Sequence, residues 1–117
     1  MNNVTIDVSA DEKAIKKECL RLKRLFKNAE ENKLKLSQKE IETAAFLTVV
    51  IRNLEKDIKE NGYKEEYQNG ANQKGVKEST AAKLHVTYTK NLLAIMRQLN
   101  ERLGGGANEK SDAFDDF

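Results

Sequence analysis

Residues 44–51 read AAFLTVVI, a run of eight positions in which Thr48 is the only polar residue. The run lies in the middle of a segment that begins with a capping-box sequence, SQKE at residues 37–40. The segment is followed by Gly62, which can take the left-handed conformation that ends a helix. Eight successive helical residues point in every direction around the axis, so the middle of this helix is apolar on all sides. We therefore predict a central helix over about residues 37–61, buried by its neighbours and by other copies of the chain.

Two further helices are predicted, one on each side of the central helix in the sequence. The first covers about residues 9–32 and opens with a capping box, SADE at residues 9–12. The third covers about residues 79–103 and ends at the three glycines 104–106; its apolar stripe suits knobs-into-holes packing. In both helices the apolar residues recur every three or four positions. The stripes are Ile15, Cys19, Leu22, Phe26 and Ala29 in the first helix, and Ala81, Leu84, Tyr88, Leu92, Ile95, Leu99 and Leu103 in the third.

The composition also indicates a helical chain that forms one domain. The 117 residues include no proline, and 34% of them are charged. Hydrophobic residues make up 38%, which is modest for a chain that has to build its own core. We predict an all-α fold of three main helices, an elongated bundle or hairpin that is completed by oligomerisation. Residues 1–8 are expected to be a flexible arm, residues 9–103 a single helical domain, and residues 104–117 a disordered acidic tail.

The predicted connector between the second and third helices, residues 62–78, is long and polar. Its most polar part, with the start of the next helix, reads EEYQNGANQKGVKEST at residues 65–80. Helix–helix connections in bundles usually need only about two to eight residues. One hypothesis is an ordered loop at a subunit contact, anchored by Tyr63 and Tyr67, in which Gly70 and Gly75 permit tight turns. The alternative is a floppy link.

The first helix carries a strongly basic outer face. Residues 13–27 include seven bases and one acid, and all seven bases fall outside the apolar stripe. Such a face could follow the phosphates of a DNA backbone, or it could be an ordinary solvated surface. Binding to a membrane surface fits less well, because the stripe has the width of a core-packing face and lacks Trp. The predicted DNA-binding residues are Lys13, Lys16, Lys17, Arg21, Lys23, Arg24 and Lys27.

The sequence contains no recognisable catalytic constellation. His85 is the only histidine and has no second metal ligand at a usable spacing. Cys19 lies on the apolar stripe of the first helix, where a small core residue is the default interpretation. We therefore predict that the chain is not an enzyme and binds neither a cofactor nor a metal.

The single cysteine rules out a disulfide within the chain and favours a reducing compartment. No apolar run approaches the length of a membrane span, and the first residues lack the pattern of a signal peptide. We expect a soluble cytosolic protein with no membrane partner.

Residues 67–79, YQNGANQKGVKES, are followed by the amphipathic segment KLHVTYTKNLLAIMRQLNERL at residues 83–103. This combination resembles the C-terminal half of phage terminase small subunits. The likeness covers about residues 38–103, and the polar connector is its distinctive part, whereas the flanking helices are generic. Residues 1–37 match only in general character, as a charged helical segment that precedes the rest.

The resemblance implies a non-catalytic DNA-packaging factor in the cytoplasm of a bacterial host. Such proteins assemble as rings, bind double-stranded viral DNA and bring it to the terminase large subunit, which holds the ATPase and the nuclease. In this interpretation the apolar central helix makes ring contacts, and the acidic end of the chain docks a partner. The predicted oligomer interface is Phe46, Leu47, Val50, Ile51, Leu54, Tyr63 and Tyr67, and the predicted docking tail is Phe114, Asp115, Asp116 and Phe117.

Two other functions remain open at this point. The chain could be a small helical DNA-binding regulator that acts as a dimer, or a protein–protein adaptor whose lysines only face solvent. Salt-sensitive binding of duplex DNA separates the adaptor from the other two, and the size of the oligomer separates the regulator from the packaging factor.

Overall fold

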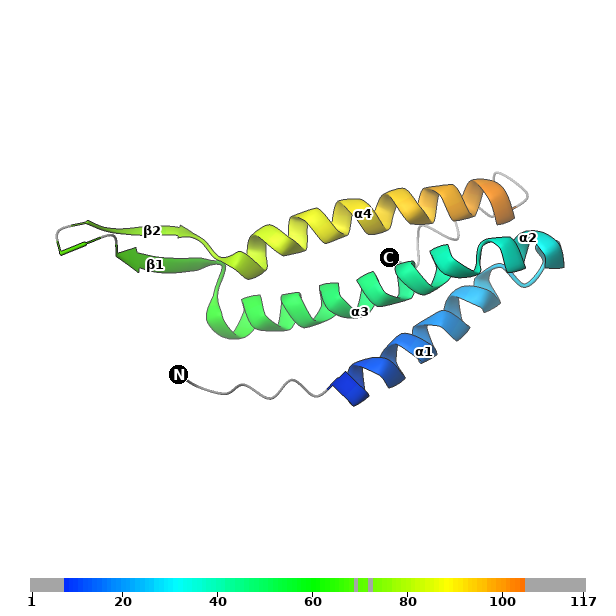
Figure 1. Ribbon diagram of the computed structural model, residues 1–117, viewed down its shortest axis with the longest axis horizontal. Coiled ribbons are helices and arrows are strands. Elements are labelled where there is room, and N and C mark those ends of the chain that lie inside the picture. The colour runs from blue at the N-terminus through cyan, green and yellow to red at the C-terminus, as the bar shows by residue number, and fades with distance from the viewer. Residues whose placement is uncertain (1–7, 69, 72, 105–117) are drawn as a thin grey trace.

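The computed structural model describes residues 8–68, 70–71 and 73–104, and the side chains from residue 11 onward. Figure 1 shows a mostly helical molecule, 62 Å in its longest dimension, from which a small two-stranded sheet projects. The predicted helical character is confirmed, and the described residues form four helices and one sheet. The elements are α1 (Val8–Leu25), α2 (Glu31–Leu36), α3 (Gln38–Asn61), β1 (Lys64–Gln68), β2 (Lys74–Glu78) and α4 (Thr80–Leu103).

The central helix of the sequence is also central in the fold. In Figure 1, α3 lies between α4 and α1, and both run antiparallel to it. Ala44 and Ala45 are fully buried, and such small side chains allow neighbouring helices to approach α3 closely. The core that the three long helices share contains Leu22 from α1, Phe26 from the turn after α1, Ile41, Leu47 and Ile51 from α3, and Leu92, Met96, Leu99 and Leu103 from α4.

The first helix is shorter than predicted. It ends at Leu25, not near residue 32, and a turn leads into the separate short helix α2. The turn is held by the Ala29 N–H, which donates to the Phe26 carbonyl at 2.9 Å, while the Phe26 side chain is buried. The apolar period continues across this break because Ala29 and Leu34 pack against the same core. Periodicity alone therefore could not locate the end of α1.

The predicted capping box at residues 37–40 is wrong, although α3 does begin there. The Ser37 N–H already donates to the Lys33 carbonyl at 3.0 Å, at the end of α2, so it is not available to Glu40. The Ser37 hydroxyl makes no cap bond and instead accepts from Arg102 Nη1 on α4 at 3.1 Å. Arg102 also forms an ion pair with Glu40. These side chains join the start of α3 to the end of α4.

The predicted connector is a β-hairpin and not a loop. Strands β1 and β2 pair antiparallel, with Lys64 opposite Glu78 and Gln68 opposite Lys74. As expected, α3 ends at Asn61, and Gly62 has a φ of 82°, in the region that glycine tolerates best.

The far end of the hairpin passes directly into α4. The Ser79 N–H donates to the Tyr63 carbonyl at 2.8 Å, which continues the strand pairing by one residue pair. The Ser79 hydroxyl then caps α4 by accepting from the Ala82 N–H at 3.1 Å. The predicted start of the last helix is therefore confirmed. The hairpin is anchored at its base and otherwise extends away from the helices (Figure 1).

Candidate nucleic-acid interface

Most of the predicted basic residues of the first helix are exposed. The side chains of Lys13, Lys16, Lys17 and Arg24 on α1 are exposed, as is that of Lys27 in the following turn. Among the described residues, none of these five side chains has an ion-pair partner within 4.0 Å. Their charges are therefore open to an anionic ligand.

The one acid of this segment, Glu18, is buried although it belongs to a charged helix. Its side chain is only 4% exposed. A buried carboxylate is costly unless it is paired and hydrogen-bonded. Arg21, one turn later on α1, supplies both: its Nε donates to Glu18 Oε2 at 2.9 Å and its Nη2 to the same oxygen at 2.6 Å. Arg21 is therefore held in place by Glu18.

A second arginine reaches Glu18 from another helix. Arg52 Nη2 on α3 lies 3.6 Å from Glu18 Oε1, and the Arg52 side chain remains 60% exposed. An open depression lies at this junction of α1 and α3, and it is lined by Ala14, Lys17, Glu18, Arg21, Arg24 and Arg52. Four cationic side chains thus line one depression, and two of them are paired with the Glu18 carboxylate. This excess of positive charge favours an anion such as a phosphate.

Sequence reasoning did not identify Arg52 because it lies 34 positions after Glu18 and belongs to the apolar central helix. The single acid among the seven bases of residues 13–27 was the available signal that Glu18 has a specific role. We define the basic cluster as Lys17, Arg21, Arg24 and Arg52, with Glu18 beneath them.

The basic residues of α1 cover a wide arc, and only one edge of this arc lies near Arg52. At 100° per residue, Lys13, Lys17, Arg21 and Arg24 lie within about 80° of one another, and Lys16 and Lys23 continue the arc on the side away from Arg21. Leu20, which is 55% exposed, lies between these two groups. The structure thus brings Arg52 to the first group alone. A DNA backbone on the basic cluster would contact Lys17 and Arg24 more readily than Lys16 or Lys23.

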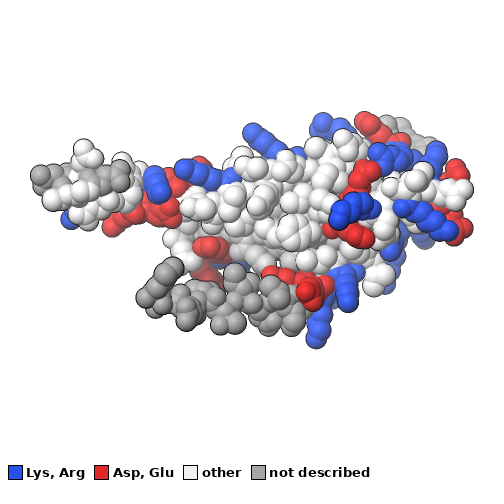
Figure 2. Space-filling model, in the orientation of Figure 1, with Lys and Arg blue, Asp and Glu red and all other residues white. Residues whose placement is uncertain are grey.

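The residues predicted as an oligomer interface fall into two groups. Leu47 and Ile51 are buried in the core of the single chain. Phe46 is 50% exposed, Val50 and Leu54 on the same side of α3 are partly buried, and Tyr63 and Tyr67 at the hairpin are exposed. Figure 2 shows a broad area over the middle of α3 and α4 without Lys, Arg, Asp or Glu. The assignment of an oligomer interface stays a prediction.

The remaining predicted residues are placed as follows. His85 Nε2 on α4 lies 3.1 Å from Glu55 Oε2 on α3, which links the two helices. Cys19 is partly buried, and burial, with Glu42 as the next contributor, raises the pKa of its thiol. The predicted docking tail, Phe114 to Phe117, lies outside the described residues, as does the arm before Val8.

Across residues 8–68, 70–71 and 73–104, no group of three or more His, Cys, Asp or Glu side chains could hold a metal ion. Among the helices in that part of the chain, none has the length and apolar character needed to cross a membrane.

Comparison of the chain with models of known protein families, with curated proteins and with solved structures found no match.

Proposed function

We propose that the chain is a non-catalytic DNA-binding assembly factor, the small subunit of a viral terminase. It would bind double-stranded DNA as an oligomeric ring in the cytoplasm of a bacterial host and deliver it to the large ATPase and nuclease subunit. The observation that supports DNA binding most strongly is the basic cluster, which combines side chains from two helices. The resemblance of residues 38–103 to terminase small subunits supports the packaging role.

The basic cluster suits a phosphate backbone better than an isolated patch of surface lysines would. Glu18 fixes Arg21, and Arg52 lies close to the same carboxylate, so both guanidinium groups lose little freedom when they bind an anion. Arginine presents a planar set of donors that matches the oxygens of a phosphate. Lys17 and Arg24 add exposed charge beside them. Contacts of this kind position a protein on DNA without specifying a base sequence.

Exposed apolar side chains on α3 and α4 support assembly of several copies. Phe46 is half exposed in the middle of α3, and Leu84, with its side chain 37% exposed, lies in the first half of α4. Large exposed apolar areas on a soluble domain commonly mark interaction sites. Phe46 also points away from the basic cluster, because Phe46 and Arg52 differ by about 120° around the axis of α3. One copy could therefore contact other copies and DNA at the same time.

Duplex binding at several salt concentrations, followed by fluorescence anisotropy, tests the proposal. Each neutralised phosphate contributes about −0.9 to the slope of log K against log salt concentration, so we expect a steep slope for the native chain. The triple variant Lys13→Glu, Lys17→Glu and Arg24→Glu should bind at least about tenfold more weakly with a shallower slope. A matched control, Lys59→Glu, Lys83→Glu and Lys90→Glu, makes the same charge change at exposed positions elsewhere on α3 and α4. Equal losses of affinity in both variants would show that the effect comes from net charge alone. Undiminished binding by the first variant would exclude the α1 face as the DNA-binding site.

A further inference from the structure

The hairpin presents two outer strand edges whose hydrogen-bonding groups have no partner in the described part of the chain. β1 and β2 pair only with each other there, so each strand keeps an open outer edge. The bond from the Ser79 N–H to the Tyr63 carbonyl fixes which residues face inward. Because the pattern alternates along an antiparallel pair, Gly75 and Lys77 direct their backbone groups toward β1. Lys74, Val76 and Glu78 therefore direct theirs outward.

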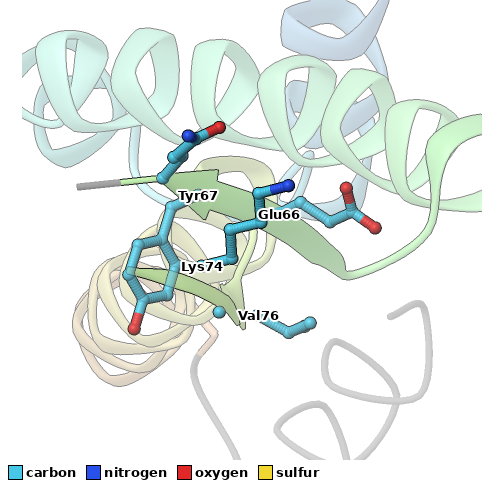
Figure 3. Close-up of a pocket in the computed structure, with 6 residues that line it drawn as sticks. Glu66, Tyr67, Lys74 and Val76 are labelled. Atoms are coloured by element: carbon cyan, nitrogen blue, oxygen red, sulfur yellow. The ribbon is translucent and has the colours of Figure 1, made fainter. Parts of the chain in front are cut away.

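The outer edge of β2 is also exposed and apolar at its centre. Val76 is 62% exposed, and Lys74 and Glu78 on either side of it are exposed as well. The three side chains lie on one face of the sheet, because residues two apart in a strand share a face. Figure 3 shows that the ring of Tyr67 extends from β1 across β2, and Tyr67 lies opposite Gly75 in the register.

The hairpin extends into solvent, and among the described residues no further strand pairs with its sheet. A two-stranded sheet is only marginally stable by itself, and exposed strand edges tend to pair with another chain. Within the hairpin, Glu65 and Lys77 form an ion pair at 3.5 Å, and Tyr67 covers Gly75 so closely that an added Cβ would lie 2.6 Å from its Cζ. These contacts belong to the face opposite Val76. They leave the face and edge of Val76 uncovered.

We propose that β2 pairs antiparallel with β2 of a second copy of this chain, about a two-fold axis at Val76. In that register Val76 lies opposite the partner's Val76, and Lys74 lies opposite the partner's Glu78 at both ends. All six residues direct their backbone groups into the new interface. The result is a four-stranded sheet with a continuous ladder, two opposite-charge pairs and one apolar pair at its centre.

The other two edge pairings are less complementary. Joining β1 to a second β1 about its central residue would place Glu66 opposite the partner's Glu66, a like-charge pair that destabilises a sheet. Joining β2 to β1 of a second copy in the register of the hairpin would place Val76 opposite Glu66 and Lys74 opposite Gln68. That arrangement also has two opposite-charge pairs, Glu78 with the partner's Lys64 and Lys77 with the partner's Glu65, but Lys77 is already paired with Glu65 of its own chain and Val76 faces a charge. Of the three pairings, β2 with β2 alone combines two new opposite-charge pairs with an apolar residue opposite Val76, and it is therefore favoured.

A charge-swap experiment tests this register in the full chain without DNA. The variant Lys74→Glu places two glutamates opposite each other at both ends, and Glu78→Lys places two lysines there. We expect the dissociation constant of the pair to be at least tenfold higher for each variant alone than for the native chain. In an equimolar mixture, a copy of one variant facing a copy of the other restores both opposite-charge pairs. Native mass spectrometry, with the two variants distinguished by a tag, should show mixed pairs well above the level of either variant alone.

The mixture gives a result that a merely misfolded hairpin would not give. Mixed pairs no more abundant than the statistical expectation would overturn the proposal. Pairing that survives Lys74→Glu but is lost in Glu78→Lys, without rescue on mixing, would also overturn it and indicate contact between β2 and β1. The proposal does not depend on DNA binding, so its failure would leave the proposed function of the basic cluster untouched.

Disulfide cross-linking supplies an independent measurement. Directly opposite residues in a hydrogen-bonded antiparallel pair have Cα atoms about 5.5 Å apart, within the range of about 4.4–6.8 Å that a disulfide spans. In a Cys19→Ala background, the Val76→Cys variant should form a covalent dimer under mild oxidation. The matched Glu66→Cys variant, on the outer edge of β1, should remain a monomer on a denaturing gel. Cross-linking of the Glu66→Cys variant in preference to the Val76→Cys variant would overturn the β2 register.

Discussion

The guanidinium of Arg52 on α3 lies 3.6 Å from the buried carboxylate of Glu18 on α1. Arg21 binds the same carboxylate from one turn further along α1. Glu18 thus fixes the packing of α1 on α3 and, at the same time, holds two arginines at the protein surface. In this way one buried acid contributes both to the stability of the fold and to the candidate DNA site.

Replacing Glu18 with Gln should destabilise the fold. The amide keeps the shape of the side chain but leaves two arginines beside each other without their carboxylate. We expect the free energy of unfolding to fall by about 1–3 kcal/mol, the usual range for loss of a charged, buried hydrogen-bond partner. Urea denaturation measures the change. Glu12→Gln, at an exposed position of the same helix, should stay within about 0.5 kcal/mol of the native chain.

Replacing Arg52 with Ala should weaken DNA binding although Arg52 belongs to the central helix. If one phosphate contact is lost, the slope of log K against log salt concentration should become shallower by about 0.9. Lys59→Ala, an exposed base on the same helix, should leave the slope unchanged. Salt titrations of the two variants provide the measurement. Identical slopes for the native chain and Arg52→Ala would exclude Arg52 from the interface.

Replacing Arg102 with Ala should loosen the junction between α3 and α4. The fully buried Ser37 hydroxyl would lose the donor that lies 3.1 Å away, and Glu40 would lose its ion-pair partner. We expect a loss of about 1–3 kcal/mol in the free energy of unfolding, because buried polar groups without partners are costly. Arg97→Ala, at an exposed position of α4, is the matched control and should change stability little. Equal unfolding midpoints for the two variants would show that the Arg102 contacts contribute nothing to stability.

Replacing Phe46 with Glu should reduce assembly without unfolding the chain. Phe46 is half exposed, so a charge there costs little in the single chain but is unfavourable in an apolar contact between copies. Sedimentation velocity should show smaller species for Phe46→Glu than for the native chain. Leu36→Glu, at a residue of α2 that is 81% exposed, is the control and should sediment as the native chain does. Unchanged assembly in Phe46→Glu would place the contact between copies on another surface.

Local sequence signals located the long helices well, but they located only some of the helix ends correctly. The apolar run at residues 44–51 predicted α3, and Gly62 and Ser79 correctly marked the end of α3 and the start of α4. The end of α1 was missed because apolar residues after the turn continue its period. The hairpin was missed because its strands are polar and exposed on both faces, so the alternation that normally reveals a strand is absent. Asn69-Gly70 was the turn signal that could have indicated it.

The candidate site was predictable only in part, for a physical reason. Spacing along one helix showed which bases lie on its outer side, and most of them are exposed. The contribution of Arg52 depends on how α1 packs against α3, which is a tertiary contact between distant positions. The role of Glu18 likewise depends on burial that a charged helix does not reveal.

Native mass spectrometry of the full chain, with and without a short DNA duplex, shows whether the chain forms an oligomer that binds DNA. We expect a discrete assembly larger than a dimer at micromolar concentration, and a complex of that assembly with the duplex that disappears as salt is raised. A chain that stays monomeric or dimeric and gains no duplex mass would contradict the proposed function.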